Sequence, residues 1–200
     1  MRVVTIKNLK GEAENRLNHD MHRLRARISR GRLAWKVRCT SGLERGNFDK
    51  LGPAYVLRLR RCDAVVGSAR LLEKVFPQLL EMAHLSTYHR IIESSRFCGD
   101  VNTAVEREQA SLRLATLVMF AGIVEWSILN GYREFVTATD GRLERILCRA
   151  DWLLSRLGAT AQINETRSVA DLFLADRQSL DRLRPGAYSS DFPIYQTEAA

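Results

Sequence analysis

Residues 54–72, AYVLRLRRCDAVVGSARLL, decide the fold of this chain. Side chains follow a period of two along residues 54–59, a polar break comes at residues 61–63, and the rest of the stretch is strand-like again. This pattern predicts an antiparallel hairpin. Because Arg70 falls inside the second strand, we expect a guanidinium within the sheet.

Helices and further strands are expected on both sides of this hairpin. Upstream, residues 2–6 predict a strand, residues 12–28 predict a helix, and the glycines and proline of residues 40–53 indicate a long loop. Downstream, the sequence predicts a helix at 76–85, a strand at 90–98, a long helix at 103–130, a strand at 134–139, a helix at 140–150, a further strand, a polar loop at 161–166, a strand at 169–174 and a short helix from 176. This order predicts an α/β (α+β) fold, a three-layer sandwich with a mixed central sheet.

Length and composition describe an ordinary globular chain. The 200 residues are 46% hydrophobic and 27% charged, without a flexible linker, so we expect one domain over residues 1–200. The most apolar run, residues 114–129, contains Glu125 and is too short to span a membrane, and no signal peptide is recognised before Lys7. We therefore expect a soluble cytoplasmic protein that does not span a membrane.

The cysteines do not suggest a metal site. Cys39, Cys62, Cys98 and Cys148 are widely spaced, without a C-x-x-C pair, and they form no recognisable ligand set with the four histidines. We expect buried or half-buried free thiols and no bound metal.

Positive charge is concentrated in the first part of the chain. Residues 1–75 contain 18 Lys and Arg against seven Asp and Glu, a net charge of +11, whereas residues 76–200 have a net charge of −3. Such asymmetry indicates an acidic partner, which could be a nucleic acid, a membrane surface or an acidic carrier protein. Residues 20–32 are basic but include no Phe, Tyr or Trp, which argues against a nucleic-acid module.

Residues 93–97, ESSRF, form the segment richest in chemical groups. Glu93 and Arg96 have apolar neighbours, so both are expected to be buried and to need partners. They fit either a structural ion pair or a general base beside a cation that positions substrate. Residues three apart on a regular strand point to opposite faces, so a shared site requires a bulge or the end of the pairing.

Trp35, Asp49 and Arg70 are further candidates. A charged Arg70 inside an apolar strand needs a partner, and Asp49 or Glu93 could supply the carboxylate. The chain contains no phosphate-binding loop, dinucleotide fingerprint or hydrolase nucleophile motif.

From about residue 2 to residue 188 the chain resembles the acyl-homoserine-lactone synthases, the LuxI/TraI-like autoinducer synthases of bacterial quorum sensing. The matching segments are MHRLR (21–25), GRL (31–33) with Trp35, GSARLL (67–72), ESSRFC (93–98), FAGI (120–123), EWS (125–127) and VTATD (136–140). The resemblance implies a fold similar to the N-acetyltransferases (GNAT-like). It also implies a reaction between S-adenosylmethionine and an acyl thioester of acyl carrier protein, in which the amine is acylated and lactonisation then releases methylthioadenosine. S-adenosylmethionine is a substrate here, and no cofactor is implied.

The resemblance also assigns roles to individual residues. It implies catalytic roles for Arg25, Asp49, Arg70, Glu93 and Arg96, and substrate-binding roles for Trp35, Phe76, Ser95, Phe97 and Thr137. A carboxylate such as Glu93 suits a general base, because the substrate ammonium must lose a proton before it can attack. The position of Thr137 is associated with preference for a 3-oxo acyl chain, although Thr139 would face the same side of a strand. An acidic carrier protein would match the basic half of the chain.

The chain departs from the family pattern at three places. Ser29 stands where an aromatic residue is expected, Gly46 stands where an acid is expected, and the segment between Leu72 and Phe76 is short. One alternative is therefore a weakened or inactive paralogue that keeps the fold and binding of the carrier protein. A second is an acyl-CoA-dependent N-acyltransferase, although residues 109–111 do not form the expected glycine-rich loop.

Overall fold

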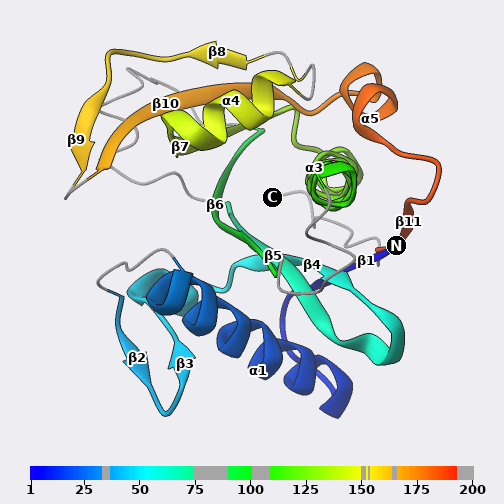
Figure 1. Ribbon diagram of the computed structural model, residues 1–200. Helices are drawn as coiled ribbons and strands as arrows, with labels where there is room; N and C mark the ends of the chain where they lie inside the picture. The colour runs from blue at the N-terminus through cyan, green and yellow to red at the C-terminus, as the bar shows by residue number, and fades with distance from the viewer. Residues whose placement is uncertain are drawn as a thin grey trace.

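The computed structural model describes residues 1–32, 37–73, 90–100, 109–149, 152, 154–163 and 166–192. A mixed sheet of nine strands forms its centre, in the order β11-β1-β4-β5-β6-β7-β10-β8, with β9 paired to β10 (Figure 1). The strands are β1 (Arg2–Ile6), β4 (Ala54–Leu59), β5 (Val65–Leu72), β6 (Ile91–Gly99), β7 (Glu134–Asp140), β8 (Leu154–Arg156), β9 (Ala161–Ile163), β10 (Thr166–Leu174) and β11 (Ser189–Asp191). The pairs β1–β11 and β6–β7 are parallel and the other pairs are antiparallel.

Helices cover both faces of this sheet (Figure 1). On one face lies α1 (Glu12–Ala26), which continues as a π-helical segment (Arg27–Arg32), next to a small hairpin of β2 (Cys39–Thr40) and β3 (Leu43–Glu44). On the other face lie α3 (Gln109–Leu129), α4 (Gly141–Arg149) and α5 (Arg177–Leu183). The predicted three-layer α/β architecture with a mixed sheet is thus confirmed.

Two apolar clusters hold the layers together. One contains Trp126 of α3 and Phe173 of β10, and the other contains Met21 and Leu24 of α1 with Leu57 of β4. All five of these residues are at most 2% exposed. Burial of such side chains stabilises the fold by roughly 1.5–3 kcal/mol each.

Local sequence signals place most element ends as predicted. The hairpin of residues 54–72 is β4 and β5, joined by a 3₁₀ turn at Arg61–Asp63. Helix α3 ends at Asn130 and Gly131, where φ is +79°, the left-handed conformation that glycine adopts without strain. Asp140 begins α4, because its Oδ1 accepts a hydrogen bond from the Leu143 amide at 2.8 Å.

Some predictions about the chain need correction, and others lie outside the described residues. The predicted polar loop at 161–166 is instead a short hairpin, because Thr166 of β10 pairs with Ile163 of β9. Cys62, on the hairpin turn, and Cys148, on α4, are exposed rather than buried, although all four thiols are free. The predicted helix at 76–85 and the beginning of the helix predicted at 103–130 lie outside the described residues.

In the part of the chain that is described, no helix has both the length and the hydropathy needed to cross a membrane.

Gly122 allows α3 to approach the sheet closely. A Cβ atom added there would lie 2.8 Å from Cγ1 of Val3 and 3.2 Å from Cγ1 of Val56. We expect Gly122→Ala to destabilise the protein by about 1–3 kcal/mol, because strands β1 and β4 would have to move. Gly141→Ala is the control, since a Cβ there meets nothing within 4 Å. Urea unfolding of both variants checks this expectation, and equal stability would contradict the close approach.

Candidate functional site

Arg25 is the centre of a buried ionic cluster on the α1 face of the sheet. It is 1% exposed, and its Nε donates a very short hydrogen bond to Oε2 of Glu44. Its Nη1 and Nη2 donate to Oδ1 and Oδ2 of Asp49 at 2.9 and 3.2 Å. This fork-like pairing fixes both the guanidinium and the carboxylate. Burial opposes the charged form of Arg25, but the bonds to Asp49 and Glu44 outweigh it and raise the pKa of Arg25.

Asp49 joins the loop after β3 to the sheet. It lies on a 3₁₀ helix (Asn47–Leu51), and its carboxylate accepts hydrogen bonds from the Tyr55 hydroxyl at 2.8 Å and the Gly46 amide at 2.6 Å. Nη1 of Arg70 lies 3.4 Å from Oδ1 of Asp49. Burial alone would raise the pKa of Asp49, but the hydrogen bonds and charge of Arg25 hold this pKa well below its usual range. The carboxylate is therefore ionised at neutral pH.

A β-bulge brings Arg96 into the same cluster. The pairing of β5 with β6 shifts between Ser68 and Arg70, and Arg96 has a φ of +53°. Ser95 and Arg96 consequently both reach this cluster: the Ser95 Oγ accepts from Nε and Nη2 of Arg70 at 3.2 and 3.1 Å, and Nε of Arg96 lies 3.5 Å from Oε1 of Glu44. Glu93 and Arg96 are three residues apart on one strand, and the bulge between them is what allows both side chains to lie on the same face of the sheet.

Glu93 lies at the last rung of the parallel pairing between β6 and β7. Its partners are Leu72 on β5 and Val136 on β7, and it is 4% exposed. Strand alternation places the Glu93 side chain on the same face of the sheet as Ser95, toward Arg70. The geometry thus gathers four of the five predicted catalytic residues into direct ionic contacts and places Glu93 on the face where they lie.

The predicted substrate-binding residues are distributed differently. The ring of Phe97 packs 5.2 Å from that of Phe120 in α3, so Phe97 lies on the opposite face of the sheet from the ionic cluster. Thr137 of β7 is 9% exposed. Strand alternation places Thr137 on the face of Phe135, which packs against Trp152 and Phe173. Trp35 and Phe76 lie outside the described residues.

Sequence reasoning missed Glu44 and Tyr55. Glu44 is 1% exposed and contacts both Arg25 and Arg96. One signal could have identified it: several buried guanidinium groups need more than one carboxylate, and residues 40–53 contain only Glu44 and Asp49 as acids. Tyr55 gave no signal beyond its place in a strand.

Two of the departures from the family pattern, Ser29 and Gly46, lie on the α1 face of the sheet, where other residues supply a carboxylate and an aromatic ring. Ser29 is 5% exposed and lies at the inner side of the π-helical segment, whereas Gly46 uses its amide to bind Asp49. Glu44 supplies a second carboxylate beside Arg25, and the Phe48 ring centroid lies 5.4 Å from Cζ of Arg70. A cation held against an aromatic face is attracted to it.

The charges of the cluster suit an anionic group. Arg25, Arg70 and Arg96 contribute three positive charges, and Glu44 and Asp49 contribute two negative charges. Burial lowers the pKa of Arg70, but a guanidinium group begins so far above neutrality that Arg70 remains charged at neutral pH. These five groups carry one net positive charge, and an ionised Glu93 on the same face adds one negative charge. The guanidinium groups can still bind a substrate carboxylate through paired hydrogen bonds. Among the described residues, no group of His, Cys, Asp and Glu is arranged to hold a metal ion.

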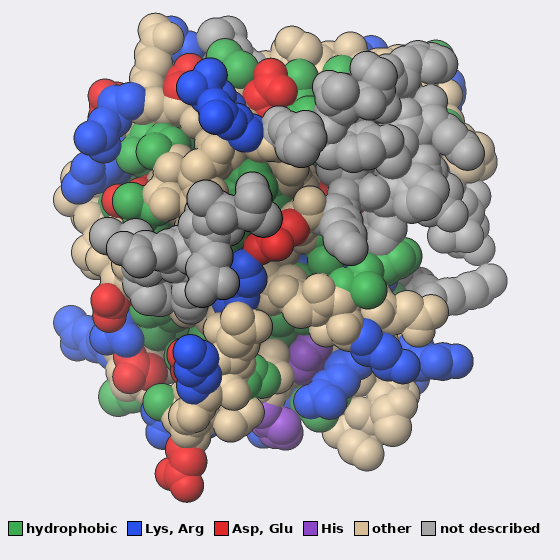
Figure 2. All heavy atoms as spheres, turned by 180° about the vertical axis from the view of Figure 1, so that it is seen from behind, with side chains coloured by type: hydrophobic (Ala, Val, Ile, Leu, Met, Phe, Trp, Pro, Cys, Tyr) green, Lys and Arg blue, Asp and Glu red, His purple; other side chains and the backbone are tan. Residues whose placement is uncertain are grey.

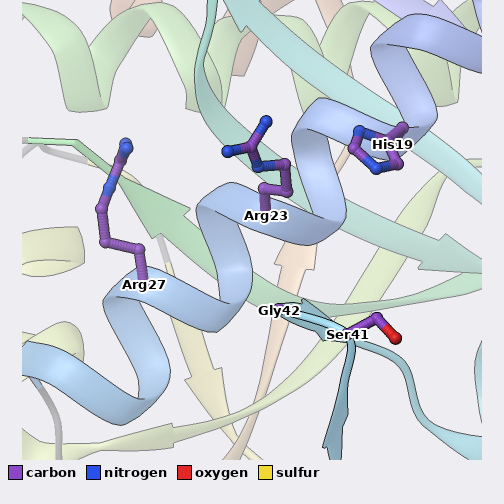
Figure 3. Close-up of a pocket in the computed structure, with 5 residues that line it drawn as sticks. All are labelled: His19, Arg23, Arg27, Ser41 and Gly42. Atoms are coloured by element: carbon purple, nitrogen blue, oxygen red, sulfur yellow. The ribbon is translucent and has the colours of Figure 1, made fainter.

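A separate cavity of about 440 Å³ lies on the outer side of α1. It is lined by His19, Arg23 and Arg27 of the helix and by Ser41 and Gly42 at the turn of the β2–β3 hairpin (Figure 3). None of the predicted site residues lines it. Seen from behind, the molecule carries many Lys and Arg side chains, and purple histidine side chains lie near some of them in the lower half of the view (Figure 2).

Comparison with solved structures identifies the fold. BjaI, a CoA-dependent acyl-homoserine lactone synthase solved with SAM and isopentyl-CoA, matches with a TM-score of 0.79 at 21% identity over 96% of this chain and 93% of BjaI. A putative N-acetyltransferase from Lactobacillus plantarum matches with a TM-score of 0.57 at 10% identity over 88% of this chain and 100% of that one. The chain therefore has an acyltransferase fold of the N-acetyltransferase type.

The family follows from the sequence comparisons. The chain belongs to the autoinducer synthase family, whose model matches residues 8–183. An acyl-homoserine-lactone synthase of Rhizobium radiobacter is 45% identical over 198 residues, which cover 95% of this chain and 93% of the relative. Members with that name are acyltransferases, so the expected enzyme class and the stated resemblance are both confirmed.

Proposed function

We propose that this chain synthesises an N-acyl-L-homoserine lactone from S-adenosylmethionine and an acyl thioester, as one domain acting in the cytoplasm. The observation that carries this proposal is the buried ionic cluster around Arg25, with Glu93 on the same face of the sheet. The 45% identical relative supports the same activity. The alternative of an acyl-CoA-dependent N-acyltransferase rests on the fold alone, whereas the family match favours a lactone synthase.

The first chemical step is acylation of the methionyl amine. Glu93 accepts the proton of the ammonium, directly or through water, and the freed amine attacks the thioester carbonyl. A C–N bond forms, the carbon–sulfur bond of the thioester breaks, and the carrier leaves as its thiol. Arg70 and Arg96 hold the methionyl carboxylate, while Arg25 and Asp49 keep these groups in position.

The second step closes the lactone. The methionyl carboxylate attacks the methylene carbon next to the sulfonium, the carbon–sulfur bond breaks, and methylthioadenosine leaves with the electron pair. Sulfonium is already a good leaving group, so positioning is the contribution that the protein needs to make. We assign the binding of adenosine and sulfonium to Trp35 and Phe76, and contacts with the acyl chain to Ser95, Phe97 and Thr137.

The proposed acyl donor is acyl carrier protein. The net charge of +11 over residues 1–75 suits the extended acidic surface of a carrier protein. BjaI is described as CoA-dependent, so the family fold alone does not select the donor. The two donors differ in salt dependence: a carrier protein held by several arginines should lose affinity steeply as salt increases.

Expression in a host without such a synthase tests the proposal. Mass spectrometry of the culture extract should detect an N-acyl-homoserine lactone when the chain is present and none with the empty vector. Soluble protein without any lactone would favour the weakened or inactive paralogue.

Thr137→Val should shift the products toward unsubstituted acyl chains. If the hydroxyl donates to a 3-oxo group, its loss removes a bond worth about 0.5–1.5 kcal/mol, a few-fold to roughly tenfold change in preference. Product profiling measures this ratio. Thr5→Val is a matched control, because Thr5 is buried in β1 and its hydroxyl has no hydrogen-bond partner among the described residues. An unchanged ratio in Thr137→Val would remove Thr137 from the acyl site.

A further inference from the structure

The central sheet divides just beyond Glu93. Strands β6 and β7 pair from Ile91–Glu134 to Glu93–Val136, after which β6 continues beside β5 and β7 beside β10. Figure 1 shows β6 curving away from β7 toward β5. Thr137 is the first residue of β7 beyond the last pair, and its partner on β10 is Asp171. The pair of Thr137 and Asp171 therefore lies next to the point where β6 and β7 separate.

Asp171 is a fully buried acid with one unused oxygen. It is 0% exposed, and its Oδ2 accepts a hydrogen bond from the Thr139 hydroxyl at 2.6 Å. Its Oδ1 has no hydrogen-bond partner among the described residues. Buried carboxylate oxygens without a donor are rare, because the lost hydration is not replaced. Such an oxygen indicates a donor that the described residues do not provide.

The nearest basic residue in the register does not provide that donor. Arg156 of β8 pairs with Asp171 across the sheet, but its Nε and Nη2 donate to Oε1 and Oε2 of Glu144 at 2.6 and 2.9 Å. The Glu144 carboxylate is an acceptor and cannot satisfy another acceptor. The unused oxygen is thus left for a ligand.

We propose, on the basis of the proposed function, that Asp171 is a specificity-determining residue whose Oδ1 accepts a hydrogen bond from a hydroxyl group on the acyl chain. Glu93 faces the ionic cluster, whereas Thr137 and Asp171 face the opposite side of the sheet, one residue beyond the pair that contains Glu93. An acyl chain attached to the reacting carbonyl therefore reaches them through the opening between β6 and β7. A 3-hydroxyacyl thioester is the donor class that this arrangement fits.

The pair of Thr137 and Asp171 discriminates between three kinds of acyl chain. A 3-hydroxyl group can accept from the Thr137 hydroxyl and donate to Asp171, so both protein groups gain a partner. A 3-oxo group can accept from Thr137 but has no hydrogen for Asp171, and its oxygen would face the carboxylate. An unsubstituted chain satisfies neither group.

Competition between acyl donors tests the assignment. Purified enzyme receives S-adenosylmethionine and an equal mixture of octanoyl, 3-oxooctanoyl and 3-hydroxyoctanoyl acyl carrier protein, and mass spectrometry measures the three lactones. We expect the wild type to favour the 3-hydroxy product over the unsubstituted one by about tenfold or more. Asp171→Leu should lose this preference. Asp171→Asn should raise the 3-oxo product relative to the 3-hydroxy product, because an amide can donate a hydrogen bond.

Controls separate specificity from folding and from the proposed function. Asp181→Asn changes the same kind of side chain at an exposed position of α5 and should keep the wild-type product ratios. Thermal unfolding shows that each variant is folded. Folded Asp171 variants with wild-type ratios, or a wild type without a preference for the hydroxyl chain, would overturn the assignment. No lactone from any donor would instead contradict the proposed function, and the role of Asp171 with it.

Discussion

Glu93→Gln should fold normally and lose about 10²- to 10⁴-fold in the rate of lactone formation. The amide keeps the size of the side chain and can still hydrogen-bond, but it cannot accept the proton of the substrate ammonium. Glu93 is 4% exposed and belongs to the last residue pair between β6 and β7, so a side chain of different size would disturb the packing. Glutamine is therefore the mildest change. Single-turnover kinetics with purified enzyme measures the loss at the acylation step.

Glu73→Gln is the matched control for Glu93→Gln. Glu73 directly follows β5, and its exposed carboxylate pairs with Lys7. Its variant should turn over as the wild type does. If Glu93→Gln turned over as fast as the wild type, Glu93 would not be the general base. The structural ion pair would then be the better explanation of its burial.

Arg25→Met should destabilise the fold by about 3–5 kcal/mol. Methionine fills a similar volume, but Glu44 and Asp49 would then be buried without the guanidinium that pairs with both. Chemical denaturation measures the change. Arg23→Met, on the exposed side of the same helix, should change stability by less than about 0.5 kcal/mol.

A second variant separates loss of the ion pairs from loss of packing. Adding Asp49→Asn to Arg25→Met removes one of the unpaired charges and should recover part of the stability. If Arg25→Met were as stable as Arg23→Met, the buried ionic cluster would not be a structural element of this fold.

The fold was largely predictable because its signals are local. The alternation in residues 54–72, the long apolar helix ending at Asn130 and Gly131, and the cap at Asp140 each depend on neighbours in sequence. The hairpin of β9 and β10 was missed for the opposite reason. Strand β9 has only three residues and residues 166–168 at the start of β10 are polar, so only the pairing between them selects the extended form.

The site was less predictable because its geometry depends on distant contacts. Arg25 was one of several arginines at the end of a basic helix, and nothing local shows that it alone points inward to Glu44 and Asp49. The bulge at Arg96 could be named as a requirement but not located, since it arises from the register of β5 against β6. The unused oxygen of Asp171 is visible only once β7, β8 and β10 are placed together.

The balance of products gives the most direct test of the proposed reaction. Purified protein is incubated with S-adenosylmethionine and acyl-loaded carrier protein, and the lactone and methylthioadenosine are quantified together. The proposed mechanism predicts equal amounts of the two, both dependent on the acyl donor. Methylthioadenosine or free carrier thiol released without any lactone, by protein that is folded, would contradict it.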